Sequence, residues 1–552
     1  MLAGTVAWPA ETAARYRREG YWDDTELFDI VRRGAARRPG QIALIDRDRR
    51  WTYADLHRDA TRLAARLLAL GLAPRDRVVM QLPNAAEFVL VYFALARIGA
   101  IPVMALRSHR QAELRHFLNA SGATAYVIGD RAGSFDFRTM ADTLRAEASP
   151  LRHVIVAGEP LPGQHALADL LRDGDIDEPS VTVDPAEVGT MLLSGGTTSM
   201  SKLIPRTHQD YVLNARLCGA AAGFDERTVF MAILPLGHNY NLASPGILGA
   251  LTFGGAVVLS PSTDTDAVFA TVQRERVTVI AAVVPLIAGC LEADVEQRFD
   301  LASLRVVQNG GARLAPELRQ RLRERFGVTP QEIYGTAEGL INMTRLDDDD
   351  ERLLHSSGAP VCDADEIVVV DDDGREVPDG EAGELMTRGP YTIRGYYDAP
   401  GKNIKNNKNI KNIEAFTADG FYRMGDIVRK RGRYVYAEGR RKDFVNRGGE
   451  KISCEEIEAL MLTHPKVKLA ALVAMPDPVF GEKACAFVVP HPGEALELAE
   501  LIIFLRAQQI AAFKLPERLE IAAELPLSPV GKILKRELRE IIAVKLAREQ
   551  PR

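Results

Sequence analysis

Residues 194–202 read Ser-Gly-Gly-Thr-Thr-Ser-Met-Ser-Lys, and they follow a short apolar run at 189–193 that has the composition of a buried strand. Consecutive glycine and hydroxyl residues leave backbone N–H groups able to point at one centre, and Lys202 adds a cation. This combination suits the phosphates of a nucleotide. A plain surface turn has a similar composition, so the stretch by itself leaves both interpretations open.

The spacing from Gly196 to Lys202 imitates the phosphate loop of P-loop NTPases. Ser201, however, stands where that loop needs a glycine before its lysine, and Leu203 stands where it needs a Ser or Thr to hold magnesium. The sequence therefore disfavours a P-loop NTPase.

Around this stretch, short apolar runs alternate with amphipathic segments from about Ile42 onward, which predicts an α/β fold of parallel strands covered by helices. A helix is expected after Thr52, because Asp55 completes a capping pair in front of an apolar stripe. A second helix is expected at 316–326, between a proline and a glycine. Strands are expected at 77–82, 189–193, 229–234, 277–284 and 304–307.

The character of the chain changes after Gly383. Short runs rich in aromatic and β-branched residues at 391–397, 421–426 and 433–437 predict an antiparallel barrel or hairpins. From Lys442 we expect a separate small α+β domain, with helices near 455–462 and 496–508 and strands near 467–475 and 484–489. The biased run 401–413 (GKNIKNNKNIKNI) predicts an exposed surface insertion.

Length and composition restrict the class of protein. The chain has 552 residues, 46% of them apolar, which predicts two to four domain-sized units. A formal net charge of −6 provides no field that would attract nucleic acid or an anionic membrane, and no apolar segment reads as a membrane span. No secretory signal is visible, so a cytoplasmic location is expected. The five scattered cysteines predict reduced structural thiols and not a zinc site.

Four further clusters carry residues that can act chemically. Residues 334–339 (YGTAEG) offer a ring for a base, a hydroxyl for a phosphate and a carboxylate for Mg²⁺, whereas an ordinary helix cap would look similar. Residues 422–426 (YRMGD) place a carboxylate after a glycine turn, where it suits a ribose. The stretches 439–443 and 446–450 fit a hinge or a solvated linker. Residues 527–532 (LSPVGK) put Lys532 after a glycine turn.

The ordered set of these five clusters resembles the adenylate-forming superfamily of acyl-CoA synthetases, luciferases and peptide-synthetase adenylation domains. The match extends from the Trp51-Thr-Tyr53 region to the Gly531-Lys532 turn. Within that superfamily the chain is similar to the stand-alone aryl-acid AMP ligases, which act on 2,3-dihydroxybenzoate or salicylate. The segments that carry the subgroup likeness are 201–208, 236–240, 244–246, 339–346 and 388–397.

The resemblance implies a large N-terminal domain at 1–439, made of two stacked αβ subdomains and a small β-barrel, a hinge at 440–443 and a mobile C-terminal domain at 444–552. It implies two steps: the acid attacks the α-phosphate of ATP and pyrophosphate leaves, and a pantetheine thiol then takes the acyl group. The catalytic residues implied are Lys532, Lys202 and His238, with Lys442 as the hinge and Glu338 as the ligand of Mg²⁺. The ATP-binding residues implied are Ser194, Gly195, Gly196, Thr197, Thr198, Lys202, Gly311, Ala312, Tyr334, Gly335, Thr336, Glu338, Asp426, Arg440 and Lys532.

The resemblance also implies an acyl pocket that favours an ortho-hydroxylated ring. Asn239 matches the residue that meets the ortho hydroxyl, and Ser244 resembles the small polar group of the dihydroxybenzoate enzymes. The expected substrate is 2,3-dihydroxybenzoate, then salicylate, and the expected partner is a phosphopantetheine-bearing aryl carrier protein supplied in trans. The pocket residues implied are His238, Asn239, Tyr240, Ser244, Asn309, Gly310, Gly335 and Ile341.

Two departures from the pattern leave alternatives open. Ser199 stands where the family loop has glycine, which keeps open a nucleotide-binding regulatory protein without turnover. Asn309 stands where an apolar residue is usual, and a buried amide needs a partner. A ring nitrogen would supply one, which keeps open a heteroaryl acid such as 3-hydroxypicolinate. An aryl-CoA ligase is a third alternative.

Overall fold

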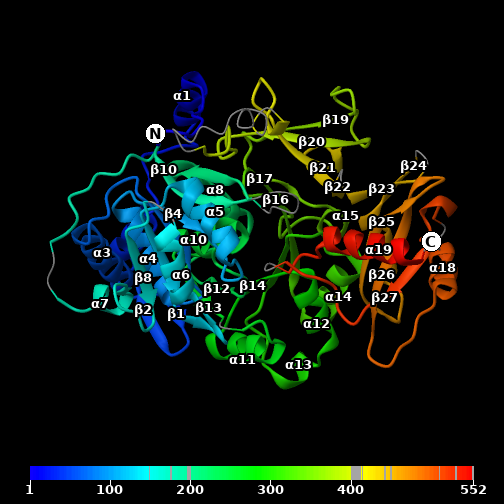
Figure 1. Ribbon diagram of the computed structural model, residues 1–552, viewed down its shortest axis with the longest axis horizontal. Coiled ribbons are helices and arrows are strands. Elements are labelled where there is room, and N and C mark those ends of the chain that lie inside the picture. Colours follow the sequence, from blue (N-terminus) through cyan, green and yellow to red (C-terminus); the bar gives the residue numbers. More distant parts are fainter. Residues whose placement is uncertain are drawn as a thin grey trace.

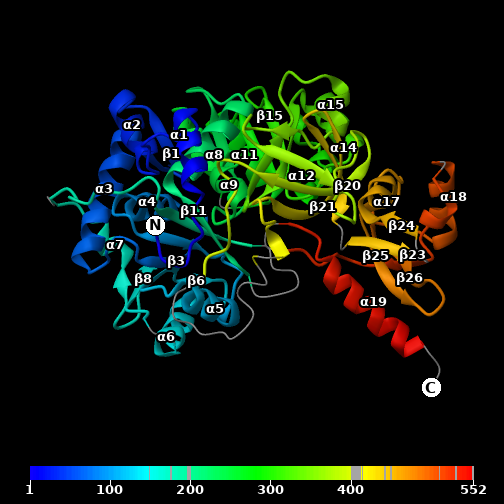
Figure 2. The ribbon, with the colours of Figure 1, turned by 90° about the horizontal axis from the view of Figure 1, so that it is seen from above.

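The computed structural model describes residues 1–147, 150–174, 177–194, 201–260, 262–398, 412, 414–440, 443–447, 450–508, 510–528 and 531–549. Figure 1 shows a broad N-terminal part, blue to green, and a smaller C-terminal part in orange and red at the opposite side. Figure 2 shows the same division from above, with the last helix directed away from the N-terminal part. Apart from Asn412, the predicted insertion at 401–413 lies outside the described residues.

The larger of the two main sheets has nine strands in the order β18-β17-β16-β15-β14-β12-β13-β1-β2. Its centre is parallel, from β16 through β15, β14, β12 and β13 to β1, and antiparallel strands flank that centre. Its strands are β1 (Ile42–Asp46), β2 (Arg49–Thr52), β12 (Val229–Ala232), β13 (Ala256–Leu259), β14 (Val279–Ala282), β15 (Val306–Gly310), β16 (Thr329–Thr336), β17 (Gly339–Met343) and β18 (Ala359–Pro360).

The second sheet has seven strands in the order β11-β10-β4-β3-β5-β8-β9, and it is parallel except for the β10–β11 pair. Its strands are β3 (Arg77–Gln81), β4 (Ile101–Met104), β5 (Ala125–Gly129), β8 (His153–Ala157), β9 (His165–Ala166), β10 (Val188–Leu193) and β11 (Leu203–Thr207). A short hairpin lies outside it, β6 (Arg131–Ala132) with β7 (Phe135–Asp136). The N-terminal part thus contains two sheets whose strands are mostly parallel, which confirms the predicted α/β class.

Helices cover both sheets, and the largest apolar core draws on strands of both sheets and on the helices between them. Helix α4 is buried along nearly its whole length, so it reads as a continuous apolar run. The helices of this part are α1 (Ala10–Arg18), α2 (Asp29–Arg37), α3 (Tyr53–Ala69), α4 (Ala86–Arg97), α5 (Gln111–Ser121), α6 (Phe137–Glu147), α7 (Leu167–Leu170), α8 (His208–Ala221), α9 (Asn239–Ala243), α10 (Gly246–Thr252), α11 (Thr265–Glu275), α12 (Val284–Glu292), α13 (Val295–Arg298), α14 (Pro316–Phe326) and α15 (Asp350–His355).

The local signals for two helices are confirmed. Thr52 and Asp55 form a reciprocal capping box at the start of α3. Helix α14 starts at Pro316 and ends at Gly327, which has a left-handed conformation. The prediction of a single strand over 277–284 is wrong. Strand β14 ends at Ala282, because Pro285 lies in the first turn of α12 and the chain continues as a helix.

The segment after β18 forms a four-stranded antiparallel sheet in the order β19-β20-β21-β22, drawn at the top of Figure 1. The described strands have β19 and β22 as edges, so they form an open sheet where the resemblance implied a small barrel. The strand expected at 391–397 is wrong, because Tyr391 and Tyr396 turn inward to hydrogen-bond buried carboxylates of Asp365 and Glu338. The strands are β19 (Glu366–Val370), β20 (Ala382–Arg388), β21 (Tyr422–Arg431) and β22 (Tyr434–Arg440).

The C-terminal part has its own five-stranded sheet and its own apolar clusters. This confirms the predicted α+β organisation after Lys442, which itself lies outside the described residues. Its elements are β23 (Phe444–Arg447), β24 (Glu450–Ser453), α17 (Cys454–Met461), β25 (Val467–Asp477), β26 (Gly481–Pro490), α18 (Leu498–Ala507), the 3₁₀ turn η2 (Ala512–Lys514), β27 (Arg518–Ile521) and α19 (Lys535–Glu549).

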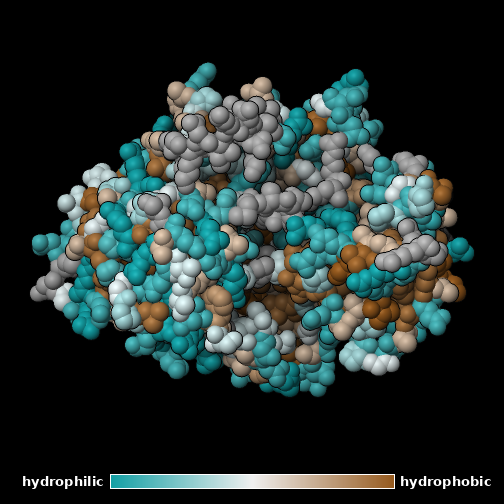
Figure 3. Space-filling view, in the orientation of Figure 1, coloured by the Kyte–Doolittle hydropathy of each residue, from teal (hydrophilic) through white to brown (hydrophobic). Residues whose placement is uncertain are grey.

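The surface is mostly polar, as Figure 3 shows, with apolar residues gathered over the C-terminal part at the right of the view. Most of the exposed large apolar side chains of the described residues belong to that part, among them Val479, Ile503 and Val544. Within the described ranges, no helix is long and apolar enough to cross a membrane. All five cysteines are unpaired and buried, as expected for reduced structural thiols.

Candidate active site

The glycine- and hydroxyl-rich stretch connects two antiparallel strands, β10 and β11, at one end of the seven-stranded sheet. Ser194 closes its base: its N–H donates to the Lys202 carbonyl at 3.0 Å, and its Oγ accepts the Lys202 N–H at 2.9 Å. Lys202 extends its Nζ over the ring of Tyr396, 4.1 Å from the centroid. Residues Gly195, Gly196, Thr197, Thr198 and Ser199 lie outside the described residues.

A carboxylate and an arginine meet beside the predicted adenine residue. Asp426 and Arg440 are paired across β21 and β22, and the Arg440 Nε lies 3.3 Å from the Asp426 Oδ1. The Tyr334 hydroxyl donates to the other oxygen, Asp426 Oδ2, at 2.8 Å. A buried carboxylate held in this way has a fixed orientation and an acceptor to offer, which suits the hydroxyls of a ribose.

The turn between β16 and β17 carries Gly335, Thr336 and Glu338. A Cβ on Gly335 would lie 2.2 Å from the Leu340 carbonyl oxygen, so only glycine fits there. Thr336 donates its hydroxyl to the Gly339 carbonyl at 2.8 Å. Glu338 is only 6% exposed, and one of its oxygens accepts the Tyr396 hydroxyl at 2.9 Å.

Glu338 fits the predicted role of a magnesium ligand. Mg²⁺ in nucleotide sites is held by one or two carboxylates, and the substrate phosphates and water supply the remaining oxygens. In the described part of the chain no group of three or more ionisable or thiol side chains is arranged around one metal position. A single buried carboxylate with one oxygen already oriented by a phenol agrees with that pattern.

Lys532 of the C-terminal part reaches the same region as these N-terminal residues. Its Cε would lie 3.1 Å from a Cβ on Gly311, which has φ +91°, so glycine at 311 leaves room for the lysine. Burial and then the neighbouring Arg440 lower the pKa of Lys532 to about 8, although Asp426, Glu455 and Glu338 act in the opposite direction. Lys532 therefore interacts electrostatically with the predicted ribose carboxylate, Asp426, and with the predicted metal carboxylate, Glu338.

Lys202 and Lys532 are far apart in the sequence, but interactions link both of them to Glu338. Lys202 lies on the ring of Tyr396, the hydroxyl of Tyr396 bonds Glu338, and Glu338 interacts electrostatically with Lys532. Burial, and then Lys532, lowers the pKa of His238 to about 3, so this imidazole is neutral at pH 7. A neutral ring beside a cationic lysine leaves the positive charge on the lysine.

Two of the predicted acyl-pocket residues, Asn239 and Ser244, belong to one buried hydrogen-bond network. The Tyr211 hydroxyl donates to Asn239 Oδ1 at 2.8 Å, and the Asn239 amide donates to Ser244 Oγ at 3.1 Å. Asn214 donates to the same Ser244 oxygen at 3.2 Å. Both acceptor positions of the Ser244 hydroxyl are therefore used, and its own proton is the group that it can still donate. Within the protein that hydroxyl is hydrogen-bonded to the thiol of Cys218, which is a weak acceptor.

Tyr240, another of the predicted acyl-pocket residues, packs against strand β15. A Cβ on Gly310 would lie 2.9 Å from the Tyr240 ring, so glycine lets the ring lie against β15. The Tyr240 hydroxyl donates to the Ala282 carbonyl at 3.4 Å, and His238 Nδ1 accepts the Tyr240 N–H at 3.3 Å. Ile341, on β17, is buried beside the turn of Gly335.

Asn309 lies on the opposite face of β15 from Tyr240, because neighbouring residues of a strand alternate. Its amide donates to Glu332 Oε2 at 3.0 Å and to the carbonyl of Ala312 at 2.7 Å. Arg319 in turn lies 3.1 Å from Glu332 Oε2. Both amide protons of Asn309 therefore find acceptors inside the protein without a ring nitrogen, whereas its Oδ1 is buried with no hydrogen-bond partner among the described residues.

Sequence reasoning missed the residues that hold the site residues in place. Tyr396 belongs to the 388–397 segment, which carries part of the family resemblance but was given no role, and Tyr211 lies three residues after the end of the 201–208 segment. Arg206, fully buried, lies 2.8 Å from Asp210 and donates to the carbonyl of Ala337, next to Glu338. Their type gives no sign of this, because a buried tyrosine or arginine is usually a packing residue.

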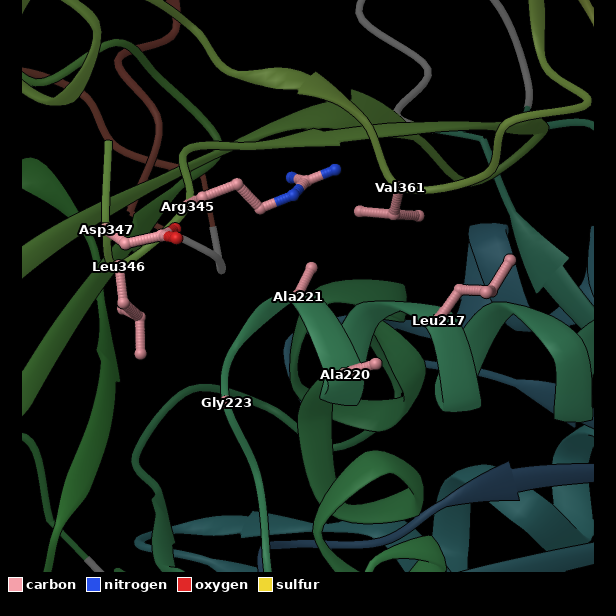
Figure 4. A pocket seen from close by; sticks show the side chains of 8 residues that line it. All are labelled: Leu217, Ala220, Ala221, Gly223, Arg345, Leu346, Asp347 and Val361. Atoms are coloured by element: carbon pink, nitrogen blue, oxygen red, sulfur yellow. The ribbon is translucent and has the colours of Figure 1, made fainter. Parts of the chain in front are cut away.

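A separate hollow lies at the C-terminal end of α8 (Figure 4). Ala220 and Ala221 of that helix face Arg345, Leu346 and Val361 across it. The hollow contains none of the predicted site residues, so it is distinct from the site described above.

Comparison with known proteins agrees with this geometry. The model of the AMP-binding enzyme family matches residues 31–397, and that of the AMP-binding enzyme C-terminal domain matches residues 456–532. A 2,3-dihydroxybenzoate-AMP ligase of Bacillus subtilis is 45% identical over 99% of both chains. A salicyl-AMP ligase of Mycobacterium tuberculosis is 43% identical over 97% of this chain and 94% of its own.

Among solved structures, the apo structure of Mycobacterium smegmatis MbtA superposes with a TM-score of 0.74 and 41% identity, covering 98% of this chain and 99% of that one. The two domain matches together span most of the described fold, in the order in which the site residues occur. The chain belongs to the AMP-binding enzyme family and, within it, to the stand-alone aryl-acid AMP ligases.

Proposed function

We propose that this protein is an acid–AMP ligase that activates an ortho-hydroxylated aromatic acid with ATP and passes the aryl group to the phosphopantetheine thiol of a carrier protein supplied in trans. The favoured acid is 2,3-dihydroxybenzoate, then salicylate, in siderophore or nonribosomal peptide synthesis. The observation that carries the proposal is the position of Lys532, whose Cε lies 3.1 Å from a Cβ placed on Gly311 and which interacts electrostatically with Asp426, Glu338 and His238.

Charge is the central problem of the first step, because a carboxylate must attack a triphosphate. The barrier falls when cations stand where negative charge accumulates on the phosphorus oxygens. Lys532 suits the α-phosphate and the attacking carboxylate, and Lys202 suits the departing pyrophosphate. Mg²⁺ held by Glu338 would neutralise further phosphate charge.

Other residues of this chain position the reactants. Asp426, oriented by Tyr334 and Arg440, would accept hydrogen bonds from the ribose. His238 is neutral, so it can take part in a hydrogen bond at the carboxylate end of the acid without competing as a second charge. Gly311 leaves room for the side chain of Lys532.

For the second step, Lys532 must leave and a thiol must enter. From the family resemblance we infer a hinge at 440–443, with Lys442 as the pivot, and a rotation there would bring Gly448 and Gly449 towards the acyl-adenylate. The exposed apolar side chains of the C-terminal part, such as Val479 and Ile503, support docking of a separate carrier protein.

The pocket network supports the preference for two ring hydroxyls. Asn239 uses one amide proton on Ser244 and keeps the second, and Ser244 can donate its proton. A ring oxygen is a better acceptor than the Cys218 thiol that Ser244 otherwise meets. These two donors match hydroxyls at positions 2 and 3 of a benzoate.

The test is exchange of labelled pyrophosphate into ATP with a panel of hydroxybenzoates, aminobenzoates and hydroxypicolinates. We expect exchange with 2,3-dihydroxybenzoate and salicylate and little with benzoate. Offering CoA and a carrier protein as competing acceptors then separates a carrier-protein ligase from an aryl-CoA ligase. Absence of exchange with every acid in the panel, while ATP still binds, would contradict the proposal and favour a regulatory nucleotide-binding protein.

A further inference from the structure

Tyr396 contacts the predicted phosphate lysine and the predicted metal carboxylate at the same time. Its ring lies under Lys202, with Nζ 4.1 Å from the centroid, and its hydroxyl donates to Glu338 Oε1 at 2.9 Å. Tyr396 is 8% exposed and Glu338 is 6% exposed, so both contacts are shielded from bulk water. In that setting, cation–π attraction and a hydrogen bond to a carboxylate are both stronger than at the surface.

The backbone around Tyr396 is attached to the same two elements. The N–H of Ile393 donates to the Glu338 carbonyl at 2.8 Å, and the N–H of Tyr397 donates to the Leu203 carbonyl at 2.9 Å, one residue after Lys202. The N–H of Tyr396 donates to Asn412 at 3.1 Å. The segment 393–397 therefore connects the end of the phosphate stretch to the turn that carries Glu338.

We propose that Tyr396 is a positioning residue that sets Lys202 and Glu338 relative to each other for magnesium-bound pyrophosphate. This inference rests on the proposed function of the site. The hydroxyl fixes one oxygen of Glu338 and so directs the other to the metal, while the ring holds the Lys202 ammonium. The two contacts can be removed separately: Tyr396→Phe keeps the ring and loses the hydroxyl, and Tyr396→Leu loses both.

The chain supplies a matched control in Tyr434. Its hydroxyl also donates to a carboxylate, that of Asp348, and a cation, that of Arg352, also lies over its ring at 4.8 Å. It lies on β22 and contacts none of the predicted site residues in these interactions. Tyr434→Phe therefore reproduces the chemical change of Tyr396→Phe at another place.

The experiment is calorimetric titration of ATP into the protein without aryl acid, over a series of Mg²⁺ concentrations. The KM for pyrophosphate is measured separately, from the exchange of labelled pyrophosphate into ATP. We expect Tyr396→Phe to need about tenfold more Mg²⁺ for the same ATP affinity, with the pyrophosphate KM unchanged. Tyr396→Leu should in addition raise the pyrophosphate KM by about threefold. Circular dichroism confirms that each variant is folded.

The inference is overturned if Tyr396→Phe binds ATP with the Mg²⁺ dependence of the wild type, or if Tyr434→Phe shifts it equally. A wild-type protein that binds ATP with Mg²⁺ but exchanges pyrophosphate with no aryl acid refutes the proposed function, whereas the binding comparison still decides the role of Tyr396. Failure of the wild type to bind ATP at any Mg²⁺ concentration refutes both.

Discussion

Replacement of Tyr211 by Phe removes the hydroxyl that orients Asn239, the residue expected to meet the ortho hydroxyl of the acid. The side chain of Tyr211 is fully buried and its hydroxyl is the donor to Asn239 Oδ1 at 2.8 Å, while Asn239 is 6% exposed. Without that donor a buried carbonyl oxygen loses its hydrogen bond, at a cost of about 1–3 kcal/mol. The amide then reorients, and the proton kept for the ortho hydroxyl of the acid is no longer directed at it.

The effect on selectivity follows from that free energy. We expect kcat/KM for 2,3-dihydroxybenzoate and salicylate to fall by about 5- to 150-fold, and that for benzoate, which lacks the hydroxyl, to change little. The assay is pyrophosphate exchange with the three acids. Tyr53→Phe is the control, because Tyr53 is equally buried and its hydroxyl donates to the carbonyls of Leu251 and Gly255 outside the pocket.

An equal loss with all three acids, or an equal loss in Tyr53→Phe, would contradict the role given to Tyr211, since it would indicate a general effect on folding. Unchanged selectivity in a folded Tyr211→Phe variant would show that the orientation of Asn239 does not select the ortho hydroxyl.

Lys532 and Gly310, the residue that lies against the Tyr240 ring, offer three further tests. Lys532→Ala should reduce pyrophosphate exchange at least about 100-fold and spare thioester formation from added aryl-adenylate; equal loss of both steps contradicts the role given to Lys532. Since burial lowers the pKa of Lys532 to about 8, kcat/KM for adenylation should fall as pH rises through about 8, because the lysine loses its proton there, whereas the thioester step should show no such decline. Gly310→Ala should raise the KM for the aryl acid by about tenfold, because the new methyl would lie 2.9 Å from the Tyr240 ring; an unchanged KM would mean that the ring can move aside.

Several features of the fold could be predicted because the deciding interactions are local. Thr52 and Asp55 cap a helix three residues apart, and Pro316 and Gly327 mark the two ends of another. Strands at 77–81 and 188–193 are apolar because they are buried in parallel sheets. The family could be recognised from the sequence, because it depends on the composition and order of the clusters around Lys202, Glu338, Asp426 and Lys532.

Other features depended on contacts between residues far apart in the chain. The run 391–397 has the composition of a strand, but Tyr391 and Tyr396 find buried carboxylates at 365 and 338, and their hydrogen bonds replace strand pairing. In the sequence Asn309 has the residue type of a ligand-binding group, but in the structure its amide donates to Glu332, on the neighbouring strand, at 3.0 Å.

Residue type and order were enough to predict an α/β chain with a small C-terminal domain, a phosphate stretch, and the two lysines and two carboxylates of the candidate site. Which of these groups meet, and what orients them, depends on the folded chain, in which Tyr396 lies between Lys202 and Glu338 and Tyr211 donates to Asn239. The difference arises because residue type and spacing fix local conformation, whereas the packing of distant elements selects the partner of a buried polar group, where leaving that group unpaired is costly.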